Sequence, residues 1–414
     1  MAGSTVNWGW LVCLLGVMSV LAILFKTGLN RLGLPPVVGY LVLGFLLRVV
    51  AVQWGVLSAD GEEIFQFLAK LGIACLLFRV GLLSSLVGLL RQLKRAVVVW
   101  LADFTVSGTV GFVTAYFVLG LPMPTSLIVA IALTATSVGV SVAAWQASGS
   151  LESPAGQLLL DVAELDDISG IVAMSLLFSL LSVIHDGAHQ GLLPGMLRQA
   201  GLFVLSLGGF VVFCYGFSRY VEERLTRVFV RMGSDSDRML LVVSTGFIIA
   251  SLAAWLGFSI AIGSFFAGLL FSRDPQSVRI DASFDALYEL FTPFFFIGIG
   301  LNIVPSSLGL AVGLGVSLLI AAILGKFLGN GLPILFTMGT TSAAVIGFSM
   351  LPRAEIAMVV MSQGLQLGQW AVPPRVYAAM VLVSAATCLL SPLSVNMLLR
   401  RWPQPPVGEP SGTP

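Results

Sequence analysis

Long apolar runs, separated by short clusters of charged residues, glycines and prolines, make up most of this chain. Most of them reach or approach the roughly 20 residues that an α-helix needs to cross the hydrocarbon core of a bilayer. The runs are continuous, whereas the strands of a membrane β-barrel would alternate between apolar and polar residues in segments of about ten. The pattern therefore predicts thirteen membrane-spanning helices, near residues 8–25, 36–53, 63–84, 96–119, 124–147, 155–184, 199–218, 238–257, 259–272, 283–303, 308–331, 338–367 and 374–398.

The composition agrees with an all-α polytopic membrane protein. Of the 414 residues, 57% are hydrophobic and only 10% are charged, against about 25% charged residues in an ordinary soluble domain. The formal net charge of +1 leaves no basic face for nucleic acid and no acidic face. The 4 cysteines stand singly in apolar segments, without a ligand spacing such as C-x-x-C, and nothing in the sequence predicts a cofactor.

Lysine and arginine residues alternate between rich and poor connections along the chain. The rich connections follow the odd-numbered predicted helices, whereas the even-numbered helices are followed only by Arg48, Arg198 and Arg375. Because positively charged loops stay on the cytoplasmic side, we expect the N-terminus outside and the C-terminus in the cytoplasm, in a plasma membrane of the bacterial inner-membrane type. The first ten residues carry no basic side chain, so the first run is interpreted as a retained span and not as a signal peptide.

A faint internal repeat relates the second predicted helix to the ninth and the third to the tenth. Its matching glycines are Gly39 with Gly263, Gly44 with Gly268, and Gly81 with Gly300. The offset is an odd number of helices, so the two copies would cross the membrane in opposite directions. Inverted repeats, with a binding site between them near the middle of the membrane, are typical of secondary transporters.

This repeat predicts a simple domain organisation. We expect one transmembrane transporter domain over residues 1–398. It would consist of a first six-helix repeat at 1–184, a linker helix at 199–218 and an inverted second repeat at 238–398. Residues 399–414 are rich in proline and glycine, and we expect them to form a disordered cytoplasmic tail.

Two adjacent acidic residues, Asp166 and Asp167, occur within the sixth predicted helix. At 1.5 Å per residue, Asp166 lies roughly 18 Å from the start of that helix, close to the middle of the membrane. Charged side chains at this depth cost about 2.5–3.5 kcal/mol each, so they usually mark a functional site that faces a water-filled cavity. Neighbouring carboxylates also repel each other, which favours exchange of protons for a cation. Packing of one acid against a basic residue is the structural alternative, but it requires no second carboxylate.

Three further charged residues are candidates near this pair. Asp161 and Glu164 lie on the same helix, where an entry funnel and a merely solvated cavity are both consistent with the sequence. Lys326 is the cationic residue of the eleventh predicted helix. It is either a lysine that snorkels to the nearby interface or an ion-pair partner of one aspartate. If a cation displaced it and it released its proton, more than one proton would move per cation.

Polar or helix-breaking residues interrupt two of the predicted helices. The fifth contains Thr134, Thr136 and Ser137, and the twelfth contains a proline directly before Arg353, followed by Glu355. Broken helices expose backbone carbonyls and helix dipoles near the middle of the membrane, where these can help to coordinate ions. A simple proline kink and hydroxyl bonds to the helix's own backbone are the structural alternatives. The corresponding positions in the two repeats favour a functional role.

Asp103, Lys70 and Arg79 are also predicted at membrane depth, and the sequence offers no clear partner for them. For these three residues we expect packing pairs or snorkelling rather than a role in transport.

Seven motifs occur in order along most of the chain, over about residues 15–395. They are GLPPVVGYLVLG at 33–44, LLFRVGL at 76–82, TATSVGVSVAAW at 134–145, the DD pair at 166–167, FTPFFFIGIGL at 291–301, Lys326, and LPRAEIAMVV at 351–360. Together these motifs resemble the second monovalent cation:proton antiporter family, within the sodium/hydrogen exchanger superfamily. The resemblance implies a homodimer, a core built around two crossed, broken helices, and ion exchange without ATP.

The resemblance also implies roles for individual residues. Asp166 would form a salt bridge with Lys326, and Asp167 would be the essential carrier of the cation and of protons. Thr134 and Ser137 match positions that line the ion site in the family.

On the other broken helix, Arg353 and Glu355 match a polar pair of the family. Two positions depart from the family pattern, namely GLL at 81–83, where GLE is common, and Glu164, where a small or apolar residue is usual. The second departure weakens any strict transfer of ion selectivity.

The sequence thus predicts electrogenic sodium/proton antiport by alternating access, with Asp166 and Asp167 binding either the cation or protons. Lithium or potassium could replace sodium, so potassium/proton exchange is one alternative, and a cation channel is a second. An enzyme, namely an intramembrane aspartyl protease, is disfavoured. Such a protease needs two carboxyl groups that converge from different helices, whereas adjacent residues on one helix diverge by about 100°.

Overall fold

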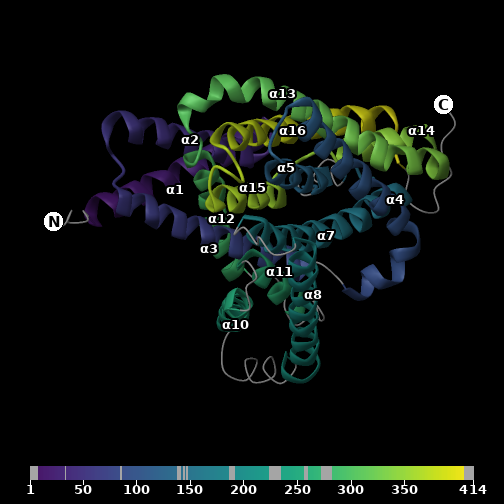
Figure 1. Cartoon of the computed structure of the whole chain (residues 1–414), viewed down its shortest axis with the longest axis horizontal. Helices are drawn as coiled ribbons and strands as arrows, with labels where there is room; N and C mark the ends of the chain where they lie inside the picture. Colours follow the sequence, from purple (N-terminus) through teal and green to yellow (C-terminus); the bar gives the residue numbers. More distant parts are fainter. Residues whose placement is uncertain are drawn as a thin grey trace. The chain divides into compact units, whose positions relative to one another are not determined.

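The computed structural model describes residues 8–404 apart from 33, 84–85, 138–140, 143–144, 146–147, 186–191, 223–234, 256–259 and 272–281. Within these residues every regular element is a helix, which confirms the predicted all-α class (Figure 1). The α-helices are α1 (Trp8–Arg31), α2 (Pro36–Trp54), α3 (Ala59–Leu83), α4 (Leu86–Val113), α5 (Met123–Thr134), α7 (Pro154–His185), α8 (Leu192–Gly216), α10 (Asp235–Trp255), α11 (Ile260–Phe271), α12 (Ala282–Leu301), α13 (Leu308–Lys326), α14 (Leu332–Ser349), α15 (Glu355–Leu367) and α16 (Pro374–Arg401).

Short helical segments of other types extend several of these helices. They are the π-helical η1 (Thr114–Val118), η2 (Phe217–Glu222) and η4 (Phe327–Gly331), and the 3₁₀ turn η3 (Pro305–Ser307). Each span predicted from the apolar runs falls on one or more of these helices. The last helix continues to Arg401, so it extends beyond the predicted start of the tail at residue 399.

In the described part of the chain, 7 helices are long and apolar enough to cross a membrane. The longest of them, Pro305–Ser349, joins η3, α13, η4 and α14 in one apolar stretch. Gly339 interrupts it, because its backbone φ of 84° leaves the helical region. Glycine adopts such a positive φ at no steric cost. The interruption falls inside the span predicted at 338–367, so the helix predicted at 308–331 continues beyond residue 331 as far as Gly339.

The chain divides into two compact units, each built from segments that are distant in sequence. The first contains Met1–Ile23, Val50–Val87 and Phe178–Gly298. The second contains Leu24–Val49, Gly88–Leu177 and Ile299–Pro414. All candidate site residues from the sequence belong to the second unit.

The first unit includes a close packing of α3 against α11. A Cβ atom on Gly81 of α3 would collide with the carbonyl oxygen of Phe265 and would lie 2.8 Å from the backbone nitrogen of Leu269. The same contact seen from α11 requires Gly268, where a Cβ would collide with the carbonyl oxygen of Phe78. Glycine is required here because the two backbones touch.

The second unit contains a matching contact between α12 and α2. A Cβ on Gly300 would collide with the carbonyl oxygen of Leu41 and would lie 2.7 Å from the backbone nitrogen of Phe45. Under the alignment that pairs Gly44 with Gly268, these α2 residues correspond to the α11 residues that meet Gly81. The two contacts therefore match residue by residue, as an internal repeat requires.

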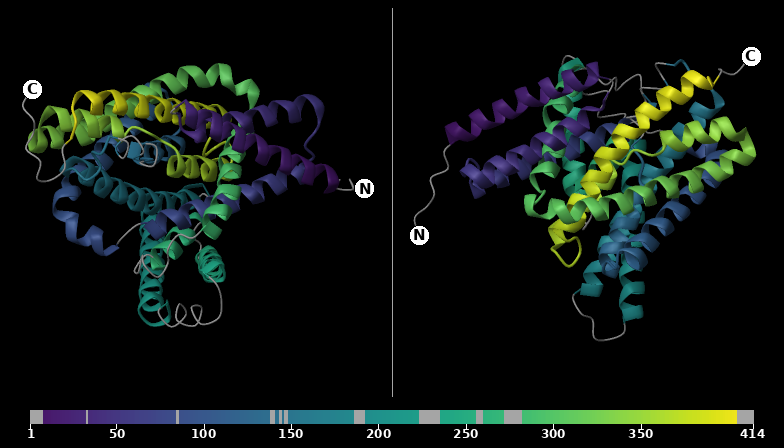
Figure 2. Two further views of the ribbon diagram at one scale, coloured as in Figure 1. Left: turned by 180° about the vertical axis from the view of Figure 1, so that it is seen from behind. Right: turned by 90° about the horizontal axis from the view of Figure 1, so that it is seen from above.

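Both predicted helix interruptions are present in the second unit. The backbone of Ala135 is extended directly after α5 ends, with φ −63° and ψ 144°, and residues 350–354 separate α14 from α15. The backbone N–H of Ser137 donates to the carbonyl oxygen of Pro352 over 2.8 Å, so the two breaks meet. Around them α15 packs on α5 and α16, and α16 packs along α13, as two further views show (Figure 2).

Candidate functional site

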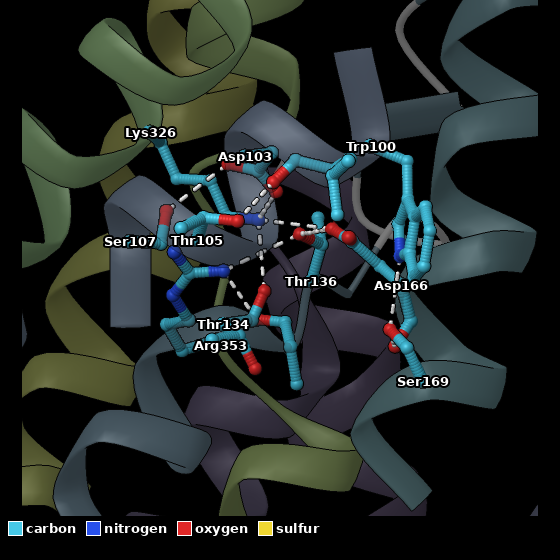
Figure 3. A network of polar contacts seen from close by, with 12 residues as sticks. Trp100, Asp103, Thr105, Ser107, Thr134, Thr136, Asp166, Ser169, Lys326 and Arg353 are labelled. Carbon is cyan, nitrogen blue, oxygen red and sulfur yellow. Dashed lines mark hydrogen bonds and ion pairs between the residues drawn. The ribbon is translucent and has the colours of Figure 1, made fainter. Parts of the chain in front are cut away.

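Lys326 lies at the centre of a buried polar network in the second unit (Figure 3). Its side chain is 0% exposed. The Nζ atom donates to Oδ2 of Asp166 over 2.9 Å, to the carbonyl oxygen of Thr134 over 2.8 Å, and to Oδ2 of Asp103. The ion pair that the resemblance implies between Lys326 and Asp166 is therefore present. The alternative of a lysine that snorkels to the interface is wrong, because the ammonium is held inside the bundle.

Two glycines bring the helix of Lys326 close to α4. A Cβ on Gly325 would lie 3.0 Å from Cα of Ser107, and a Cβ on Gly329 would lie 2.7 Å from Cα of Asp103. Larger residues at either glycine would push the two helices apart. The Ser107 hydroxyl, one turn after Asp103 on α4, donates to Oδ1 of Asp103 over 3.0 Å. Lys326 thus contacts the carboxylate of Asp103, which Ser107 on the same helix, α4, holds in position.

Asp166 of α7 is the second carboxylate of the network and is 1% exposed. Its Oδ2 accepts hydrogen bonds from Lys326 and, over 2.8 Å, from the Thr136 hydroxyl. Its Oδ1 is buried without a hydrogen-bond partner among the residues that the structure describes. A buried, unsatisfied carboxylate oxygen is costly. Asp166 therefore offers an open acceptor for a cation or a proton.

Two hydrogen bonds connect α4 to the backbone of α7 at Asp166. The indole Nε1 of Trp100 donates to the Ser169 hydroxyl over 3.0 Å. That hydroxyl in turn donates to the backbone carbonyl oxygen of Asp166 over 3.1 Å. The turn of α7 that bears the carboxylate is thereby connected to α4, which also carries Asp103.

The broken segments supply the second cation of the network. Arg353 is 0% exposed, and its Nη1 donates to the carbonyl oxygen of Ala135 and, over 3.3 Å, to the Thr136 hydroxyl. Its backbone N–H donates to the Thr387 hydroxyl on α16 over 3.1 Å. Arg353 therefore offsets the negative ends of carbonyls that the interruption of α5 exposes. Thr136 joins this arginine to Asp166, because it contacts both.

The remaining predicted site residues surround this network to different degrees. Asp167 follows Asp166 on α7 and is half-buried, as is Asp161 one to two turns earlier. Glu355 is the acidic residue in the first turn of α15, where a negative charge suits the helix dipole. Ser137 is buried and joins the site through its backbone bond at the break. The side chain of Glu164 lies outside the described residues.

Asp103 is a member of the network that the sequence did not assign to the site. Pairing within the bundle or snorkelling was expected, and pairing is what occurs: Asp103 is 0% exposed and contacts Lys326, a partner that the sequence did not name. A usable signal was present, since a lone acid and a lone lysine at membrane depth can neutralise each other only by pairing. The glycines on either side of Lys326 would have indicated a close neighbouring helix. Arg79, by contrast, forms a half-exposed pair with Asp285, 3.6 Å apart, in agreement with its expected packing role.

Asp103 and Asp166 also bear on the enzyme alternative. They come from different helices, as the carboxyl groups of an aspartyl protease must. However, Nζ of Lys326 contacts Oδ2 of both. An ammonium group therefore occupies the position between the carboxylates that a catalytic water would need.

Known proteins resemble this chain over most of its length. The family described as "Sodium/hydrogen exchanger, transmembrane" matches residues 17–401. The "High-affinity Na(+)/H(+) antiporter NhaS3" of Synechocystis sp. is 27% identical, over 91% of this chain and 88% of that protein. The "Na(+)/H(+)-K(+) antiporter GerN" of Bacillus cereus is 24% identical, over 87% of this chain and 89% of that protein.

The fold itself is shared with a solved structure. The sodium proton antiporter MjNhaP1 from Methanocaldococcus jannaschii superimposes with a TM-score of 0.71 at 18% identity, over 97% of this chain and 99% of that one. The family match covers both interrupted helices, both carboxylates and the buried lysine. This chain therefore belongs to the transmembrane sodium/hydrogen exchanger family and is a cation/proton antiporter.

Proposed function

We propose that this antiporter exchanges sodium for protons by alternating access, and that Asp166 and Asp167 are the groups for which the two ions compete. One observation carries the assignment of the site. Asp166 is buried, one of its oxygens is held by Lys326 and Thr136, and the other has no partner in the described structure. Such a carboxylate is available to an ion but is already paired when no ion is bound.

Competition follows from the chemistry of the carboxylates. A sodium ion needs oxygen ligands, and we propose that the open oxygen of Asp166 and the half-buried carboxylate of the next residue, Asp167, supply them. A proton on either carboxylate removes the negative charge that attracts the cation. Because each ion binds best where the other is absent, the loaded site holds one or the other, and movement of the loaded site exchanges them.

The interrupted helices suit this cycle. Arg353 contacts the Ala135 carbonyl and the Thr136 hydroxyl, and so adds a second positive charge near the carboxylates, besides that of Lys326. With these charges and the exposed backbone dipoles, the site can lose its cation without leaving a large uncompensated charge. The two carboxylates can hold more than one proton for each cation, which supports electrogenic exchange. We also propose a homodimer in a bacterial inner membrane, with the N-terminus outside and the C-terminus in the cytoplasm, a non-enzymatic role, and a single transporter domain with two inverted repeats.

Potassium is the main alternative cation. The name of the relative from Bacillus cereus includes both sodium and potassium, and carboxylate, hydroxyl and carbonyl oxygens suit either ion. A channel is a weaker alternative, since a channel does not need a protonatable pair of carboxylates that a lysine neutralises.

Transport in everted membrane vesicles tests the proposal. After respiration acidifies the vesicle interior, sodium should release the accumulated protons, and potassium should do so less effectively. Asp166→Asn and Asp167→Asn should abolish this response, because each removes a carboxylate for which the ions compete. Glu152→Gln is the matched control, since Glu152 is an exposed carboxylate just before α7. Full activity of Asp167→Asn, or an equal response to every cation, would contradict the proposal.

A further inference from the structure

We propose that Asp103 is a second ion-pair partner of Lys326, which compensates the lysine's charge while a transported ion occupies Asp166. The inference rests on the exchange function proposed above. It assigns to Asp103 the role of a positioning residue, one that acts on the cation through Lys326.

The geometry places one lysine between two carboxylates. Nζ of Lys326 contacts Oδ2 of Asp103 and Oδ2 of Asp166, and all three side chains are almost completely buried. The two aspartates differ in their other contacts. Asp103 uses its second oxygen to accept from Ser107, so the described structure satisfies both of its oxygens. Asp166 keeps its second oxygen without a partner. Asp166 is thus the carboxylate that is open to an ion, and Asp103 is the closed one.

This asymmetry changes the cost of loading the site. A cation that binds Asp166 must compete with the ammonium group of Lys326 for the same carboxylate. If Asp166 were its only counter-ion, the displaced lysine would remain as an uncompensated buried charge, which is strongly unfavourable. With Asp103 in contact, Lys326 loses Asp166 as a partner but keeps Asp103. Asp103 therefore lowers the free energy of the state in which the cation is bound, and it makes it easier for Lys326 to leave Asp166.

The local sequence favours this contact independently of the charges. Gly325 and Gly329 leave no room for a Cβ against Ser107 and Asp103, so the lysine's helix lies directly on α4. Because the two helices already touch, Asp103 can hold Lys326 without movement of either helix. Arg353, the other buried cation, is directed instead to Ala135 and Thr136. In the described network Lys326 is therefore the cation that Asp103 contacts directly, whereas Arg353 acts on it only from a distance.

The first experiment measures sodium-dependent proton movement in proteoliposomes of the full chain. Asp103→Asn should raise the apparent KM for sodium by about tenfold or more, because the displaced lysine is left uncompensated. The maximal rate should change much less, since the carboxylates that bind the ion are intact. Asp103→Glu should restore part of the affinity. Asp285→Asn is the control, because it removes a carboxylate from an ion pair with Arg79 in the other unit and should leave the KM unchanged.

A double-mutant cycle distinguishes action through the lysine from direct binding. In a Lys326→Gln background, Asp103→Asn should have no further effect on sodium affinity, because no lysine remains to be compensated. Sodium binding is followed by the rise of the melting temperature with sodium concentration, which does not require transport. An equal loss of affinity in both backgrounds would overturn the proposal, and so would an unchanged KM in Asp103→Asn.

If Asp103→Asn does not fold, Ser107→Ala provides the test. It removes the hydrogen bond that holds Oδ1 of Asp103 while leaving every charge in place. The KM should then rise, but by less than in Asp103→Asn, because the hydrogen bond is lost while the charge of Asp103 remains. An unchanged KM would overturn the proposal. Absence of sodium-dependent proton movement in the unmodified protein would instead reject the proposed function.

Discussion

The backbone N–H of Ser137 donates to the carbonyl oxygen of Pro352 over 2.8 Å, and this bond joins the two interrupted helices at their breaks. The two residues are far apart in sequence and belong to different repeats of the predicted organisation. Their contact brings the exposed carbonyls of one break within reach of Arg353, which follows Pro352 in the other. Each interruption therefore helps to satisfy the polar groups that the other exposes.

The proline is expected to be necessary for this arrangement. Pro352→Ala restores a backbone N–H and allows α14 to continue as a helix. The carbonyl that Ser137 uses would then turn back into helix bonding, and the maximal exchange rate should fall by about tenfold or more because the site loses its alignment. Pro374→Ala is the control, since this proline lies in the first turn of α16 and interrupts nothing. Normal exchange rates in Pro352→Ala proteoliposomes would show that the break does not depend on the proline.

The close approach of the Lys326 helix to α4 gives a second prediction. Gly329→Ala places a Cβ 2.7 Å from Cα of Asp103, and this overpacking should destabilise the protein by about 1–3 kcal/mol. It should also reduce exchange, because the lysine is moved relative to its carboxylates. Gly313→Ala on α13 is the matched control, as no atom lies within 4 Å of its added Cβ. Melting temperatures in detergent and exchange rates measure both effects, and equal behaviour of the two variants would contradict the packing argument.

The matching glycine contacts give a third prediction. Gly81→Ala and Gly300→Ala should each lower the melting temperature, because in both cases the new Cβ collides with a backbone carbonyl of the neighbouring helix. Each loss should be about 1–3 kcal/mol, and the two should be similar if the contacts are repeats of one another. Gly208→Ala on α8, with open space around it, should be neutral. A large effect in only one of the two variants would argue against a structural repeat.

The coupling ratio gives a fourth prediction. Asp166 and Asp167 can together take up two protons for each departing cation, so net positive charge should move in the direction of the protons. An inside-negative potential should therefore accelerate sodium efflux from proteoliposomes. The sodium gradient at which net exchange stops, at a given pH difference, should change with the membrane voltage. Rates that do not respond to voltage would instead indicate one proton per cation.

Much of the fold could be predicted because its signals are local. The apolar runs specify where helices cross the membrane, since each span must satisfy its own backbone hydrogen bonds. The proline before Arg353 and the hydroxyl residues around Thr136 indicated both interruptions, and both are present. The acidic pair and the lysine were recognisable because buried charges are costly and therefore rare. In contrast, Gly339 was not recognised as the point that interrupts the helix, because a positive φ leaves no mark in a sequence that contains 45 glycines.

By itself, the sequence determined the helical class, the approximate spans and the two breaks, and its family resemblance implied that Asp166 pairs with Lys326. Only the tertiary structure decided that Lys326 lies between two carboxylates and that Asp103 is the second. The physical reason is that apolar periodicity and charge cost are properties of one helix, whereas a contact between helices depends on which faces meet. Which faces meet depends on small residues such as Gly329 on one helix and on the shape of the helix that packs against it. The pattern along a single helix therefore does not specify its partner.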